Sequence, residues 1–303
     1  MHDIAEFLSQ VSENGIFSAV QLYFVVKRAR YISFNPQLSN NVQERLLDLL
    51  IKSINDSTNE QAVVPYNPIG VADGEIELIG HESMSKIDEF FESLSDDKII
   101  KDMREIKVDK IDFYAIKVEY EGNQLVVFRQ FQKMKRLRKG FLTRIINNEL
   151  SVFEGDFFGI DENIDLLFWQ DEMLIINHIA LERVMCYKDV FLQKTAEAIN
   201  TIRNENIIVN IDSFAEDCNR DIRIAKRFTE MMSKGKLPLF FRNYDKVPEI
   251  VIALNLNINF DEEKKLVYEN KGQLFHIVNL LSDSYFKSLL AERYGVVKTE
   301  GEI

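Results

Sequence analysis

Two strand-like runs joined by a short turn constrain the fold of this chain more than any other feature of its sequence. Ile111–Tyr120 and Leu125–Phe131 are rich in β-branched and aromatic residues, which favour strands. The turn between them, Glu121-Gly122-Asn123, contains Gly and Asn, the two residues that best tolerate positive φ. The pattern predicts a β-hairpin.

Elements of both kinds flank this hairpin. Before it, Ile16–Phe34 has the composition of one or two strands, and Ser39–Ile54 has the apolar spacing of a helix. Strands precede helices in the second half of the chain, so the α+β class is favoured over a parallel doubly wound sheet. We expect a mixed or antiparallel sheet of short strands and hairpins with helices packed on it. The later elements expected are strands at Leu150–Phe153, Ile164–Trp169, Met173–Ile176 and Leu254–Phe260, and helices at Lys188–Ile202, Phe214–Ser233 and Gln273–Tyr294.

A domain boundary is expected near residue 105. Gln61–Gly80 is dense in Pro and Gly and predicts a loop-rich connection, and Lys86–Leu94 predicts a short helix before a polar stretch. We therefore expect a smaller N-terminal α/β module over residues 1–105 and a larger α+β domain over residues 106–303.

One segment carries positive charge against an acidic background. The chain has 37 Lys and Arg against 49 Asp and Glu, a net charge of −12, and such a chain is normally repelled by nucleic acid and anionic lipid. Between residues 129 and 144, the basic segment, there are seven basic residues and no acid. Clustered Lys and Arg are the side chains that contact phosphates. The basic residues are Arg129, Lys133, Lys135, Arg136, Arg138, Lys139 and Arg144.

The hairpin and the basic segment together resemble the KwaB-like family, the soluble subunit of the Kiwa anti-phage defence system. The similarity extends from Asp109 to Leu290 and includes the runs 111–120, 128–140, 147–150, 156–161, 177–183 and 284–290 in order. The resemblance implies a homodimeric bacterial protein that binds DNA and works beside a membrane-embedded KwaA-like partner. It supplies no catalytic motif, so the role of the basic residues is inferred from their charge.

Fewer residues support an enzymatic function. Glu105-Ile106-Lys107, with Asp96 or Asp97 upstream, has the form of a Mg²⁺-dependent nuclease site. The four histidines lie far apart without zinc-ligand spacing, and no nucleotide-binding glycine motif is visible, so no cofactor is predicted. A third alternative is an interaction module whose basic segment docks acidic protein or lipid headgroups and never contacts DNA.

The expected location is the cytoplasm. The chain has two cysteines and no disulfide framework, and its apolar stretches are shorter than the ~20 residues that cross a bilayer. Recruitment to the inner membrane would then depend on the partner. The sequence thus favours a non-catalytic protein that grips duplex DNA through its backbone and blocks phage replication or transcription by occupancy.

Overall fold

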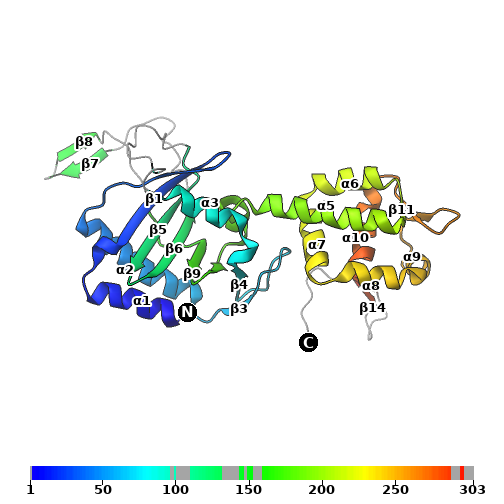
Figure 1. The fold of residues 1–303 in the computed structure, drawn as a ribbon, viewed down its shortest axis with the longest axis horizontal. Helices are drawn as coiled ribbons and strands as arrows, with labels where there is room; N and C mark the ends of the chain where they lie inside the picture. The colour runs from blue at the N-terminus through cyan, green and yellow to red at the C-terminus, as the bar shows by residue number, and fades with distance from the viewer. Residues whose placement is uncertain are drawn as a thin grey trace. The chain divides into compact units, whose positions relative to one another are not determined.

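The computed structural model describes residues 2–95, 99, 110–131, 143–146, 149–152, 159–287 and 294–296. The chain forms two compact units, seen in Figure 1. Unit 1 contains Met1–Pro65 and Gly74–Met185, and unit 2 contains Tyr66–Asp73 and Cys186–Ile303. The expected boundary near residue 105 has no counterpart in this division.

Unit 1 is built around an eight-stranded mixed sheet with the order β2-β1-β5-β6-β9-β10-β4-β3. Neighbouring strands are antiparallel except for β3 and β4, which are parallel. The α+β class is therefore confirmed. The strands in this order are Tyr31–Phe34, Val20–Lys27, Phe113–Tyr120, Asn123–Gln130, Leu166–Trp169, Glu172–Ile175, Glu75–Gly80 and Ala62–Pro65.

The predicted hairpin is β5 and β6, with Tyr120 opposite Asn123. Its turn is the two-residue pair Glu121-Gly122, both with positive φ, which is the type I′ geometry that matches strand twist. Asn123 is the first residue of β6 and lies outside the turn, contrary to the expectation.

Helices cover both faces of the sheet. On one face, α1 (His2–Glu13) and α2 (Asn40–Thr58) bury residues such as Phe7 and Leu47 against alternate residues of β1, β5 and β6. On the other face, Phe90 of α3 (Ser85–Ser93) packs edge-on against Phe128, with ring centroids 4.9 Å apart. The short helix α4 (His178–Val184) also packs on β6 and β10. Burial from both sides explains why β1, β5 and β6 are almost continuously apolar.

The N-terminal part of the chain supplies half of this sheet. β1 pairs with β5 from Val20↔Val118 to Val25↔Phe113, across the expected domain boundary. The segment expected to be a loop-rich connection contains β3 and β4, and β4 pairs with β10. Residues 1–105 therefore form part of a common sheet with the residues that follow.

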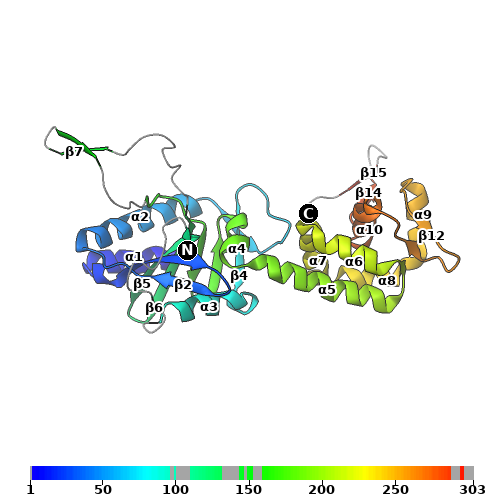
Figure 2. The same ribbon diagram turned by 90° about the horizontal axis from the view of Figure 1, so that it is seen from above.

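Unit 2 is mainly helical, and Figure 2 shows its helices from above. Its core joins Phe214 and Phe228, from two consecutive helices, to Ile277 from a helix about 50 residues later in the sequence. A small sheet has the order β11-β13-β12, from Ile208–Val209, Leu266–Val267 and Asn259–Phe260. The helices are α5 (Tyr187–Glu205), α6 (Ile211–Arg220), α7 (Ile222–Ser233), α8 (Lys236–Arg242), α9 (Val247–Ala253) and α10 (Leu274–Leu281).

Two elements of unit 2 differ from the sequence expectation. The single helix expected at Phe214–Ser233 is two helices, because Asp221 leaves the helical conformation and its side chain caps α7 by accepting from Arg223 N at 3.0 Å. The alternating run from Leu254 forms only the two-residue strand β12. Among the described residues, no helix is both long and apolar enough to cross a membrane.

Candidate nucleic-acid interface

The seven predicted contact residues divide into three groups. Lys133, Lys135, Arg136, Arg138 and Lys139 lie outside the described residues. Arg144 lies on β7 (Thr143–Ile146), opposite Ser151 of β8 (Glu149–Val152), and only the backbone of these strands is described. Arg129 near the end of β6 is the one whose side chain is described. The structure therefore shows how the basic segment begins.

Arg129 is held by two carboxylates. Its residue is only 8% exposed. Nε and Nη2 donate to the two oxygens of Asp161 at 3.0 and 2.9 Å, a bidentate pair, and Nη1 donates to Asp165 Oδ1 at 2.9 Å. These bonds occupy the guanidinium, so Arg129 anchors the start of the basic segment and presents little of its charge to solvent.

Asp165 is the centre of this cluster. Its side chain is 1% exposed, and its Oδ2 accepts from Gln130 N at 2.6 Å while Oδ1 also accepts from Asn177 Nδ2 at 2.8 Å. Its backbone joins β6 and β10, because Asp165 N donates to Phe128 O and Asp165 O accepts from Ile176 N. A buried carboxylate needs such partners, since its desolvation is otherwise costly.

The ion pairs change the pKa values of Asp161 and Arg129. Burial alone would raise the pKa of Asp161, but hydrogen bonds from Arg129 and Asn163 together with the guanidinium charge lower it below its usual value. Burial likewise favours deprotonation of Arg129, and the two carboxylates more than offset this, so its pKa is raised. Both groups are charged at neutral pH.

The Arg129–Asp161 contact connects residues on either side of the part of the sequence that contains most of the basic residues. Phe131 N, before that part, donates to Asp112 O at 3.0 Å, and Gly159 follows it; between them the structure describes residues 143–146 and 149–152. The Arg129–Asp161 pair spans 32 residues of sequence. We call this contact the neck clamp. It joins Asp161 to the end of β6.

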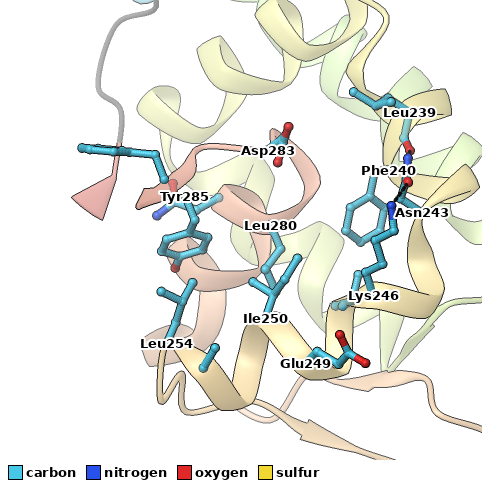
Figure 3. Close-up of a pocket in the computed structure, with 14 residues that line it drawn as sticks. Leu239, Phe240, Asn243, Lys246, Glu249, Ile250, Leu254, Leu280, Asp283 and Tyr285 are labelled. Atoms are coloured by element: carbon cyan, nitrogen blue, oxygen red, sulfur yellow. Dashed lines mark hydrogen bonds between the residues drawn. The ribbon is translucent and has the colours of Figure 1, made fainter. Parts of the chain in front are cut away.

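A 550 Å³ pocket lies in unit 2, away from these residues in the sequence. Apolar side chains from α8, α9 and α10 line it, among them Leu280 and Ile250 at its centre in Figure 3. Lys246, Glu249 and Asp283 surround them. Its volume is typical of a small-molecule site. The lining favours an apolar ligand group over acid–base chemistry.

The proposed nuclease residues Asp96, Asp97, Glu105 and Lys107 lie outside the described residues. Within the described part of the chain, no group of His, Cys, Asp and Glu side chains is arranged to hold a metal ion. His178, which follows an apolar run, contacts Glu77 of β4 through Nδ1 at 2.6 Å. Glu77 is 101 residues away, and no local pattern in the sequence indicated this pair. It ties α4 to β4.

Residues 108–291 match the family model described as Kiwa protein KwaB-like. The chain belongs to this family. The match starts just before β5 and contains the whole basic segment and the neck clamp, whereas β1 to β4 precede it.

A curated relative agrees with this assignment. The chain is 25% identical over 179 residues to Kiwa protein KwaB of Escherichia coli O55:H7 (strain RM12579 / EPEC), which is 55% of this chain and 52% of the relative. The chain thus spans about half the length of the curated relative that it matches. No solved structure matches it.

Proposed function

We propose that this protein is the DNA-binding, non-catalytic subunit of a Kiwa anti-phage defence system. The observation that carries the proposal is the neck clamp. It is a buried ion-pair cluster at the first residue of a segment with seven basic residues, in a chain of net charge −12. Family membership supports the assignment to Kiwa.

In this proposal Lys133, Lys135, Arg136, Arg138 and Lys139 neutralise backbone phosphates, and Arg144 extends the contact. Arg129 positions the segment. Phosphate contacts carry no sequence information, so the protein covers duplex DNA of any sequence and obstructs replication or transcription by occupancy. A homodimer would present two basic segments, and a transmembrane KwaA-like subunit would recruit the cytoplasmic protein to the inner membrane.

The test is the salt dependence of binding to duplex DNA, measured by fluorescence anisotropy. Five phosphate contacts give a log–log slope of roughly −4 to −5 for one protomer, and an Arg136→Ala/Arg138→Ala variant should flatten this slope by about 2. The matched control is Lys194→Ala/Arg220→Ala, which removes two exposed cations that pair with Glu197 and Glu216 in unit 2. Unchanged slope and affinity in a folded Arg136→Ala/Arg138→Ala protein would remove the segment from the interface.

Cleavage is tested in the same samples. Duplex DNA incubated with the protein and Mg²⁺ or Mn²⁺ should remain intact. Metal-dependent cutting that disappears in a Glu105→Ala variant would replace the proposal with the nuclease alternative.

A further inference from the structure

The hairpin between β1 and β2 carries exposed positive charge at the end of the sheet where the basic segment begins. Lys27 pairs with Tyr31, and the intervening residues Arg28, Ala29 and Arg30 form an exposed tip. The tip is the dark blue loop that connects β1 and β2 in Figure 1. It belongs to the part of the chain that precedes the family match.

Hydrogen bonds through Asp112 fix this tip beside the start of the basic segment. Asp112 Oδ2 accepts from Lys27 N at 2.6 Å, and Asp112 O accepts from Phe131 N at 3.0 Å. One residue therefore holds both the end of β1 and the last described residue before Lys133. Because β1, β5 and β6 are consecutive in the sheet, the end of β1 and the end of β6 lie two strands apart.

Arg183 and Lys110 add to the charge at this end. Lys27 Nζ donates to Arg183 O, and Arg183 Nη1 donates to Gln130 Oε1 at 3.4 Å. Lys110 is exposed and lies two residues before Asp112 in the chain. Together we call Lys27, Arg28, Arg30, Lys110 and Arg183 the basic edge.

In the described part of the chain, the side chains of the basic edge form no salt bridge, unlike several other cations. Lys52, Lys117 and Lys194, for example, all pair with glutamates. Asp161 and Asp165 nearby are occupied by Arg129. The Asp112 carboxylate lies among these cations through its contact with Lys27 N, and the five positive charges exceed its single negative charge, which leaves a local positive field in an acidic protein.

We propose that the basic edge is a second phosphate-binding surface that binds the backbone of duplex DNA. This inference rests on the proposed function. Arginine forks match phosphate oxygens bidentately, and the tip presents two of them. The residue between them is Ala29, which offers no apolar anchor of the kind that inserts into a bilayer, so DNA is favoured over a lipid surface.

The experiment compares Arg28→Ala/Arg30→Ala with the wild-type full-length protein in binding to duplex DNA across a salt series. Each lost phosphate contact changes the slope by about 0.9, so the slope should flatten by about 2 and the affinity at 0.1 M salt should fall at least about tenfold. Arg28→Lys/Arg30→Lys should keep the slope, because counterion release depends on charge. Lys194→Ala/Arg220→Ala is again the matched control. The melting temperature should be unchanged, since both arginine side chains are exposed.

The outcomes separate this inference from the proposed function. If Arg136→Ala/Arg138→Ala weakens binding while Arg28→Ala/Arg30→Ala keeps wild-type affinity and slope, the basic edge is not part of the interface and the proposed function stands. If wild-type protein does not bind DNA, both fail. If Arg28→Ala/Arg30→Ala instead abolishes binding to phosphatidylserine-containing vesicles with DNA binding intact, the surface recognises lipid and the inference is overturned.

Discussion

The role of the single residue Arg129 depends on the side chains near it in space and not on its neighbours in the sequence. In the sequence it begins a run of seven cations, and that proximity suggested a phosphate contact. Its actual partners, Asp161 and Asp165, follow it by 32 and 36 residues. No local spacing marks these carboxylates as its partners. The sequence therefore showed the basic segment but not the ion-pair cluster at its first residue.

Replacing Arg129 by Met should destabilise the protein strongly. The change leaves the carboxylate of Asp165, 1% exposed, without its charge partner, and breaking such a buried pair costs about 3–5 kcal/mol. Denaturant unfolding measures the loss. The control Lys52→Met breaks an exposed pair with Glu162, and such a solvent-screened pair contributes little to stability. Equal losses in the two variants would contradict a structural role for Arg129.

The lowered pKa of Asp161 predicts the pH range in which its ion pair with Arg129 stabilises the fold. Its pKa is lowered in the folded protein relative to the ordinary value of 3.8, so its ionised form stabilises the fold. This stabilisation is fully present above the unfolded pKa and is lost as the pH falls through the lower folded pKa. The stability difference between wild type and Asp161→Asn should thus be constant above about pH 5 and shrink below pH 3.8. A difference that persists undiminished at pH 2 to 3 would argue against this ion pair.

At the scale of elements, tight turns set the strand pairing of unit 1. Both the β5–β6 turn, Glu121-Gly122, and the β9–β10 turn, Gln170-Asp171, have two residues with positive φ. The sequence located the β5–β6 turn, because Gly and polar residues interrupt the apolar runs there. It misplaced the end of this turn by one residue, because Asn123 tolerates positive φ but is instead paired with Tyr120.

Replacing Glu121 in the β5–β6 turn should change the stability of the fold. Glu121 adopts φ 49°, a left-handed conformation that is strained for a residue with a long side chain. Glu121→Asn creates the Asn-Gly pair that type I′ turns prefer and should stabilise the fold by roughly 0.5–1 kcal/mol. Glu121→Val should destabilise it by about 1 kcal/mol or more, because β-branched residues avoid this region. Thermal unfolding distinguishes the two, and the opposite order would rule out this turn geometry.

At the scale of the whole molecule, the sequence predicted the class correctly because local patterns report whether a segment is strand or helix. It could not predict which strands pair. β4 and β10 are joined through pairs such as Leu78↔Leu174, and β1 reaches across the expected boundary to β5. Pro and Gly near residues 65–80 indicate turns, but they do not show that the strands around them return to the same sheet.

This pairing predicts that a chain restricted to residues 106–303 will not fold properly. Removing β1 exposes the hydrogen-bonding edge of β5, and removing α1 and α2 uncovers the apolar face that they bury. We expect aggregation in size-exclusion chromatography and a weakened strand signal in circular dichroism. A monodisperse product with cooperative thermal unfolding would instead make residues 106–303 an autonomous domain.

The outermost strand β3 has a consequence for behaviour at high concentration. It ends at Pro65, which lacks an N–H, and Val63, two residues earlier, is 46% exposed. An open strand edge is a template on which a second molecule can add its own strand, and a proline there removes one of the donors that such growth requires. Pro65 should therefore slow the formation of fibrils by this protein. A Pro65→Val variant should form fibrils faster, measured by thioflavin T fluorescence.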